Sequence, residues 1–327
     1  MTAPLHIVRV ADIEPRDPGQ DWLVQQLWGR AAVGFVAGAP KACKSWLALD
    51  MAVSVASGTA CLGRFEVDDV GTALVYLAED HIASVRQRVK ALCDYRGLDL
   101  DRLDLHVIAA PSLRLDLAAD LQRLDAALQQ LRPRLLVLDP LVRLHRCDEN
   151  SSAEVSGLLG ALRELNRRYD VAVVLVHHMS KKARANLGQA LRGSGDLHAW
   201  TDSACYLVRR GKGHLQLTVE HRASPAPEPM RLSLVDDDDG IRLQLDGAER
   251  PSEPLAEAVR AALRAADGPR TRTALRSNLA VNNARLGQAL LELEARGLAQ
   301  RGPNGWSLSQ QLPLECTQKS TLPAPRS

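Results

Sequence analysis

Residues 38–45 read Gly-Ala-Pro-Lys-Ala-Cys-Lys-Ser and stand between an apolar run and a stretch with a helical pattern. A loop of this kind is typical of a P-loop, in which backbone N–H groups and a helix N-terminus bind phosphate oxygens. Lys44 would reach the β- and γ-phosphates, and Ser45 would bind Mg²⁺ through its hydroxyl. We expect the ligand to be ATP with Mg²⁺, contacted by Gly38, Ala39, Pro40, Lys41, Ala42, Cys43, Lys44, Ser45 and Trp46.

Cys43 departs from the pattern G-x-x-x-x-G-K-[ST], because it replaces the second glycine. A β-carbon at this position either is held at positive φ, which costs about 1–2 kcal/mol, or forces a shifted loop. The nearby helix start could lower the pKa of the thiol, or Cys43 could simply be a small residue that fits. The alternative for the whole motif is a strand–turn–helix that binds no ligand. The alternative for Trp46 is packing in the core instead of stacking on a base.

Two other apolar runs end in carboxylates. Asp139 follows residues 135–138, as in a Walker B strand, and would orient the magnesium shell through water. The alternative for Asp139 is a helix N-cap. Glu79 follows a run that begins at residue 73, and it is our candidate for polarising the attacking water. Its neighbour Asp80 could instead cap the following helix.

A third apolar run ends in His177 and His178. A neutral imidazole at this point could hydrogen-bond a phosphate or a water molecule and report its presence. The alternatives are structural histidines and a zinc pair, and the zinc pair is disfavoured because adjacent residues of a strand point to opposite faces.

These residues belong to an alternation of apolar runs with helical patterns. The runs are residues 32–37, 72–77, 103–108, 135–138, 172–176 and 204–208, and the helical patterns are residues 45–56, 82–95, 118–131 and 154–169. The alternation predicts an α/β fold with a mostly parallel sheet covered by helices on both faces. Ligands of such sheets bind at the carboxyl ends of the strands. We expect every candidate residue of this region to lie there, including Arg192 and Arg222. Residues 214–221, 230–235 and 241–245 alternate, which predicts an antiparallel edge.

The order of the motifs resembles the RecA-like P-loop ATPases, in particular the plasmid RepA-type hexameric helicases and their AAA-labelled relatives. The matching segments are residues 38–45, 76–80, 136–139, 174–181, 191–196 and 221–225. The resemblance implies that Glu79 activates water and that His178 senses the γ-phosphate. It also implies a homo-oligomeric ring, which we expect to be a hexamer with single-stranded DNA in its channel.

Arg222 stands where the resemblance places an arginine finger, which would reach the nucleotide of the neighbouring subunit. Arg192 is the rival for that role, or a contact to nucleic acid in the channel. A Lys often stands two residues before the finger in related hairpins, whereas this chain has Glu220. The alternative for Arg222 is a plain surface charge.

The C-terminal part follows a different pattern. Residues 255–310 predict helix, short helix, helix and a hairpin with an Asn-Gly turn, which looks like a winged helix. Residues 252–310 hold eight Arg and five acids, a net charge of +3. Asn282 and Arg285 could read base edges of duplex DNA, and Arg301 could meet phosphate. The alternative is a winged helix that docks on proteins.

We therefore expect a lead-in over residues 1–30, a RecA-like domain over 31–246, a linker over 247–254, a winged helix over 255–310 and a disordered tail over 311–327. The net charge of +2 argues against a chain-wide attraction to nucleic acid. The six cysteines show no metal-binding spacing, and neither a secretory pattern nor a membrane span is present in the sequence, so we expect a cytoplasmic protein. The function that we predict is an ATP-dependent DNA helicase or translocase. The alternatives are a DNA-binding regulatory ATPase without unwinding and a phosphotransferase.

Overall fold

The computed structural model describes residues 7–13, 21–148, 151–179, 196–211, 213–237, 240–246, 253–266, 268–279 and 283–309. The strands are β1 (Trp22–Val24), β2 (Trp28–Gly29), β3 (Val33–Gly38), β4 (Ala73–Leu77), β5 (Leu105–Val107), β6 (Leu135–Asp139), β7 (Ala172–His178), β8 (Ser203–Arg209), β9 (His214–His221), β10 (Met230–Asp237), β11 (Gly240–Leu245), β12 (Ala299–Gly302) and β13 (Gly305–Leu308). The α-helices are α1 (Lys44–Ser57), α2 (Ile82–Arg96), α3 (Ala118–Leu131), α4 (Ser152–Tyr169), α5 (Asp196–Trp200), α6 (Glu253–Arg264), α7 (Arg272–Leu279) and α8 (Asn283–Ala295). Short 3-10 helices are η1 (Val10–Asp12), η2 (Leu100–Arg102) and η3 (Leu141–Arg143).

The main sheet has nine strands in the order β11-β10-β9-β8-β3-β7-β6-β4-β5. The pairs from β8 to β5 are parallel, and the pairs from β8 to β11 are antiparallel. Both the α/β class and the antiparallel edge that the sequence predicts are confirmed. The P-loop strand β3 is central, and Gly34 allows its close approach to β8, since a β-carbon at Gly34 would lie 1.8 Å from the Ser203 carbonyl oxygen.

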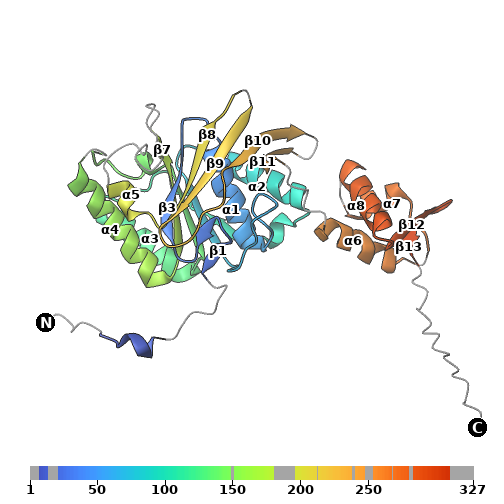
Figure 1. The fold of residues 1–327 in the computed structure, drawn as a ribbon, viewed down its shortest axis with the longest axis horizontal. Helices are drawn as coiled ribbons and strands as arrows, with labels where there is room; N and C mark the ends of the chain where they lie inside the picture. The colour runs from blue at the N-terminus through green and yellow to red at the C-terminus, as the bar shows by residue number, and fades with distance from the viewer. Residues whose placement is uncertain are drawn as a thin grey trace, which may run out of the picture. The chain divides into compact units, whose positions relative to one another are not determined.

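Helices cover both faces of this sheet, with α1 and α2 on one face and α3, α4 and α5 on the other (Figure 1). The parallel strands β3, β4 and β6 are buried at every position. Burial on both faces explains why their sequences are continuous apolar runs without alternation. The strands therefore form a fixed frame, and the residues that follow their carboxyl ends are held in place relative to one another.

A buried ion pair fixes the helix that follows the P-loop. Asp50 on α1 lies 2.7 Å from the guanidinium of Arg96 on α2, and the two side chains are 4% and 2% exposed. Arg96 also donates to the hydroxyls of Ser54 and Thr59, at 2.8 and 3.0 Å. The Leu62 N–H donates to Asp50 Oδ1 at 2.8 Å. Because a buried charge is tolerated only when it is paired and hydrogen-bonded, this network ties α1 to α2 in one arrangement.

The N-terminal lead-in that we predict over residues 1–30 is wrong for its last ten residues. Strands β1 and β2 pair as an antiparallel ribbon, and Leu23, Val24, Leu27 and Trp28 are at most 1% exposed within the core. The Trp28 indole N–H donates to the carbonyl of Ala32 at 3.2 Å, next to the start of β3. Residues 21–30 thus belong to the globular part, and their apolar side chains pack beside α1 and β8.

The C-terminal unit, residues 252–327, is a separate compact body. It contains α6, α7, α8 and the hairpin of β12 and β13, packed around Val259, Leu286, Leu290 and Trp306. Arg270 exchanges two backbone hydrogen bonds with Trp306, each 2.8 Å long, and so adds a bridge to the hairpin. The tail that we predict over residues 311–327 and most of the predicted linker lie outside the described residues. Within the described residues, no helix is both long enough and apolar enough to cross a bilayer.

Candidate nucleotide-binding site

Residues 38–45 form a loop between the end of β3 and the start of α1. Gly38 is required at the strand end, because a β-carbon there would lie 2.6 Å from the carbonyl oxygen of Leu207 on β8. Cys43 is the N-cap of α1 and has φ 59° and ψ 26°, in the left-handed region. Lys41 is also left-handed, with φ 63°. Of the two possibilities raised for Cys43, the structure has the strained backbone.

Lys44 is buried at the base of this loop and is only 6% exposed. Its Nζ donates to the Ala39 carbonyl at 3.0 Å and lies 3.4 Å from Nδ1 of His178. Burial lowers the pKa of Lys44, and the charges of Asp139, Cys43 and Glu79 oppose that effect. The ammonium group is thus held inside the loop, where phosphate oxygens could become its partners.

His178 stands beside the P-loop because β7 pairs with β3 in parallel and places it opposite Gly38. The Met179 N–H then donates to the Gly38 carbonyl at 3.1 Å. His177 points to the other side of the strand, where it is buried and its ring lies 5.8 Å from that of Phe35. Of the two histidines, only His178 lines the loop.

Asp139 ends β6 and is 6% exposed. Burial raises its pKa to about 6, against the lowering effects of a hydrogen bond from Ser45 and the charge of Lys44. Its Oδ2 atom is buried and has no hydrogen-bond partner among the described residues. An unsatisfied carboxylate oxygen next to a serine hydroxyl fits a Mg²⁺ shell, because Mg²⁺ prefers oxygen ligands and keeps several waters. The residues present therefore fit the metal ion that the P-loop implies, and Ser45 and Asp139 are the residues that would hold it.

The pKa of the Cys43 thiol is shifted in the direction opposite to the one that a helix start would produce. Burial raises its pKa, and the positive charges of Arg209 and Lys44 only partly oppose this. The expectation of an acidified thiol is therefore wrong, since desolvation of the half-buried sulfur outweighs these two positive charges. The simpler interpretation, a small residue that fits the slot, agrees with the structure.

Glu79 follows β4, which pairs with β6 so that Leu77 lies opposite Asp139. The Ala78 N–H donates to the Asp139 carbonyl at 2.7 Å, which brings Glu79 to the same rim. Arg143 from η3 donates to Glu79 Oε1 at 2.7 Å, and both side chains are at least half exposed. A pocket of about 300 Å³ results, with charged and polar lining residues Lys41, Lys44, Ser45, Glu79, Arg88, Asp139 and His178.

Asp80 and Trp46 meet at Arg88 on α2, a residue that the motifs do not mark. Both Arg88 Nη atoms donate to the Asp80 carboxylate, at 2.8 Å each, and its guanidinium carbon lies 5.6 Å from the centre of the Trp46 ring. The expectation that Asp80 caps α2 is wrong, because the N-cap is His81, whose side chain accepts from the Ala83 N–H. Trp46 and Arg88 both line the pocket.

Arg209 is a second residue that sequence reasoning missed. It ends β8, the strand beside β3, and its guanidinium donates to the carbonyl of Lys41 in the loop. Arg209 could have been found from the sequence, because ligands bind at the carboxyl ends of parallel strands and Arg209 stands at such an end. Arg143 also follows such an end, four residues after Asp139. Arg88 carries no such signal, because it lies on a helix.

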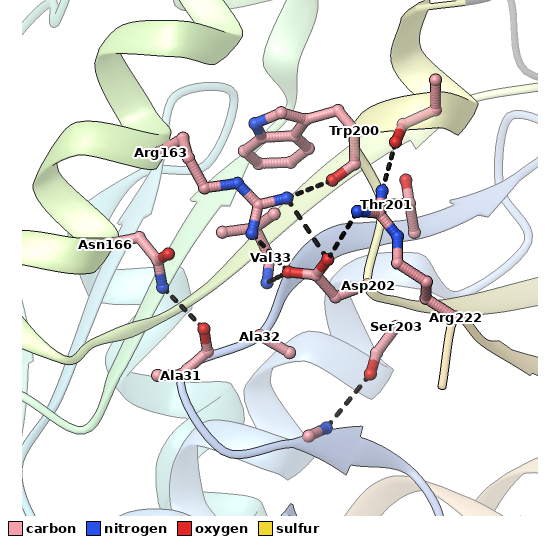
Figure 2. A network of polar contacts seen from close by, with 12 residues as sticks. Ala31, Ala32, Val33, Arg163, Asn166, Trp200, Thr201, Asp202, Ser203 and Arg222 are labelled. Carbon is pink, nitrogen blue, oxygen red and sulfur yellow. Dashed lines mark hydrogen bonds and ion pairs between the residues drawn. The ribbon is translucent and has the colours of Figure 1, made fainter. Parts of the chain in front are cut away.

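Arg222 does not lie at the carboxyl edge, which corrects the expectation that all candidates gather there. Strand β9 runs antiparallel to β8 and pairs His221 with Ser203, and the Arg222 N–H donates to the Asp202 carbonyl at 2.9 Å. Arg222 thus lies at the amino edge of the parallel strands, with its guanidinium at the Ala199 carbonyl and 3.5 Å from Asp202 (Figure 2).

The candidates for nucleic-acid contact are only partly described. Arg192 and Asn282 lie outside the described residues, and for Arg285 the structure describes the backbone, within α8, but not the side chain. Arg301 is exposed on β12, where it pairs with Trp306 across the hairpin.

Comparison with known proteins gives one family match, and the similar solved structures include a recombinase and a replicative helicase. Residues 2–184, more than half of the chain, match the family described as AAA domain. The RadB recombinase is 17% identical, with TM-score 0.49, over 66% of this chain and 92% of that one. A DnaB-like replicative helicase, solved in a study of its interactions with primase, is 16% identical, with TM-score 0.49, over 65% of this chain and 59% of that one. With a P-loop opening α1 at the carboxyl edge of a mostly parallel α/β sheet and a family match across this region, the chain belongs to the AAA domain family.

Proposed function

We propose that the protein is an ATP-dependent DNA helicase or translocase of the RepA-like type, which hydrolyses ATP in a ring of identical subunits. The observation that carries the proposal is the separation of two charged sites on one sheet. The P-loop pocket lies at the carboxyl edge, and Arg222 lies at the amino edge. A ring would join the two edges and bring Arg222 to a nucleotide, a role that the alternative of a plain surface charge does not give it.

The separation is too large for Arg222 to serve the nucleotide of its own chain. Gly38 pairs with Leu207 on β8, whereas Arg222 bonds to Asp202, five residues earlier. Five strand residues span about 16 Å, which is farther than an arginine side chain extends. In a head-to-tail ring each subunit offers one edge to its neighbour, so Arg222 of one chain would meet the P-loop of the next. We expect six subunits, as in the family that the sequence resembles.

At the P-loop, the roles follow from position. Backbone N–H groups of residues 38–45 and the Lys44 ammonium bind the phosphates, while Ser45 and Asp139 hold the Mg²⁺ shell. When bound, Mg²⁺ offsets the negative charge on the β- and γ-phosphate oxygens. Glu79 polarises the attacking water, and His178, 3.4 Å from Lys44 Nζ, detects the γ-phosphate. Arg192, which follows His178 by 14 residues in the sequence, is the proposed contact to single-stranded DNA.

The C-terminal unit would be a winged helix that contacts duplex DNA. Three helices, a hairpin and the Arg270 bridge support that interpretation. Asn282 and Arg285 near the start of α8 would face base edges, and Arg301 on the hairpin would meet phosphate. The net charge of +3 over residues 252–310 favours DNA over a protein partner.

The test combines three measurements on the full chain. We expect ATP hydrolysis to increase with single-stranded DNA, the mass in solution to rise to a ring in the presence of nucleotide, and a forked duplex to be unwound. Lys44→Ala is the control that should fail in hydrolysis and unwinding. A chain that hydrolyses ATP and binds DNA without displacing a strand would favour the regulatory switch, and a chain that stays monomeric under all conditions would contradict the ring.

A further inference from the structure

The carboxylate of Asp202 is shared by two arginines at the amino edge of the sheet (Figure 2). Arg163 on α4 donates to both of its oxygens, to Oδ2 through Nη1 and to Oδ1 through Nη2 at 3.3 Å. Arg222 approaches Oδ1 more loosely, at 3.5 Å. The side chains of Arg163 and Asp202 are 21% and 26% exposed, whereas that of Arg222 is 52% exposed. Arg163 is therefore the firm partner of Asp202, and Arg222 rests on the pair that these two residues form.

The same carboxylate is bound to the strand that carries the P-loop. The N–H of Val33, the first residue of β3, donates to Asp202 Oδ2 at 3.2 Å, and the Asp202 N–H donates back to the Val33 carbonyl at 2.8 Å. Arg163 also donates to the Trp200 carbonyl and stacks over the Trp200 ring, 5.4 Å from its centre. Contacts from β3 and α4 thus fix the position of Asp202.

Arg222 itself opens onto a pocket. The pocket measures about 370 Å³, and its lining includes His198, Asp202, Glu220, His221 and Arg222. Glu220 lies 3.4 Å from the His198 imidazole, and the second anchor of Arg222 is the neutral carbonyl of Ala199. Arg163 already offsets the negative charge of Asp202. The contact with Asp202 therefore fixes the direction of the Arg222 guanidinium but compensates its positive charge only in part. A phosphate, which carries more negative charge and can also bind arginine in bidentate fashion, would compete for it.

We propose that Asp202, held by Arg163, is the positioning residue that directs Arg222 at the nucleotide of the neighbouring subunit, an inference that rests on the proposed function. Asp202 sets the direction of the guanidinium through Oδ1 and fixes its strand through the backbone bond to the Arg222 N–H. Because Asp202 is also bonded to Val33, the same residue links Arg222 to the strand that ends in its own chain's P-loop.

Mixed rings test this role apart from any effect on a subunit's own nucleotide site. Arg222→Ala subunits keep a P-loop but lack the finger, and Lys44→Ala subunits keep the finger but lack an active P-loop. Each should be inactive alone, and a mixture should recover ATP hydrolysis wherever Arg222 of one chain faces an intact P-loop. Placing Asp202→Asn in the Lys44→Ala subunit should lower the recovered kcat at least about tenfold, because small misplacements of a catalytic group are costly. KM should stay unchanged, since the hydrolysing sites belong to the other subunit.

Two further substitutions in the Lys44→Ala subunit complete the test. Arg163→Gln should lower the recovery as Asp202→Asn does, and it decides the matter if Asp202→Asn reduces assembly. Asp125→Asn is the matched control. Asp125 on α3 bonds Arg168, which lies on α4 as Arg163 does, at 2.8 Å. The recovered hydrolysis should not change. Full recovery with both Asp202→Asn and Arg163→Gln would overturn this inference alone. If Lys44→Ala subunits do not rescue Arg222→Ala subunits, the arrangement in trans fails and this inference with it.

Discussion

At the carboxyl edge of the sheet, Lys44 and Asp139 are each 6% exposed, whereas at the amino edge the side chain of Arg222 is 52% exposed. Burial shifts the pKa of Lys44 down and that of Asp139 up. One edge thus holds charges inside the protein at a cost in stability, and the other presents a charge to solvent. The difference fits the proposed function, in which the P-loop is prepared within a single chain and Arg222 acts on the nucleotide of a neighbouring chain.

The two edges also differ in how their charges are anchored. Lys44 and Asp139 are held by groups within the pocket, the Ala39 carbonyl and the Ser45 hydroxyl. Arg222 is held through Asp202, whose main partner Arg163 comes from a helix on the face of the sheet. Substitutions at the carboxyl edge should therefore act on nucleotide binding by one chain. Substitutions at the amino edge should act on turnover in the assembly.

Lys44→Ala should have the largest effect. Loss of the buried ammonium removes the charge that meets the phosphates, so we expect hydrolysis to fall at least about a hundredfold and nucleotide binding to weaken in the single chain. Calorimetry with Mg²⁺ and ATP and a steady-state hydrolysis assay would measure both. Lys90→Ala, at a half-exposed lysine paired with Asp94, is the control. Full activity in Lys44→Ala would show that the P-loop assignment is wrong.

Arg222→Ala should show that the two edges of the sheet affect different steps, turnover in the assembly and nucleotide binding by the single chain. We expect kcat of the assembled protein to fall by about a thousandfold or more, as for the loss of an arginine finger. The nucleotide affinity of the single chain should not change, because Arg222 lies about 16 Å of strand away from its own P-loop. Arg123→Ala, at an exposed arginine of α3, is the control. A large loss of affinity in the single chain would break the comparison, since Arg222 would then act in cis.

Much of the carboxyl edge could be predicted from sequence, because it follows from local patterns. Continuous apolar runs mark buried parallel strands, and polar residues that follow them at 79, 139 and 178 must gather where those strands end. The left-handed backbone of Cys43 is one of the two possibilities that the replaced glycine leaves open, and the structure has it. Local sequence is therefore enough to predict the loop, its acids and His178.

The rest depends on partners far apart in the chain. Arg209 reaches a carbonyl 168 residues away, and Arg163 reaches Asp202 across 39 residues. Residues 21–30 look like a lead-in because Pro15 and Pro18 precede them and their apolar stretch is short, yet Trp28 is fully buried. The edge at which Arg222 lies is set by the antiparallel register of β8 and β9, which no local pattern of single residues specifies.

Asp139→Asn should abolish ATP hydrolysis and raise the free energy of unfolding at pH 7. Burial raises the pKa of Asp139 from 3.8 to about 6, so between these values the folded chain binds more protons than the unfolded chain. Stability therefore falls as pH rises through this window, and the full cost, about 3 kcal/mol, is present at pH 7. Asp139→Asn should remove that cost at pH 7 and gain progressively less towards pH 4, while hydrolysis is lost. Denaturant unfolding at several pH values would measure this.

Asp104→Asn provides a control of opposite sign for that series. A hydrogen bond from Thr72, then one with His106, lowers the pKa of Asp104. Its contribution is present above the pKa of the unfolded chain and is lost as pH falls, so Asp104→Asn should slightly destabilise the protein at pH 7. A pH-independent gain in Asp139→Asn would show that packing, not the buried charge, accounts for the change.

Cys43→Gly should have the smallest effect, because two terms oppose each other. Glycine relieves the left-handed strain, about 1–2 kcal/mol, but adds about 0.5–1 kcal/mol of backbone entropy to the unfolded chain. We expect a net gain in stability of at most about 1.5 kcal/mol, with a modest increase in nucleotide affinity. Arg132→Gly, at φ 47° in the C-cap of α3, relieves the same kind of strain away from the pocket and should leave affinity unchanged. A loss of affinity in Cys43→Gly would mean that the half-buried thiol itself shapes the loop, and the preparation of the carboxyl edge would then depend on a side chain and not on its backbone alone.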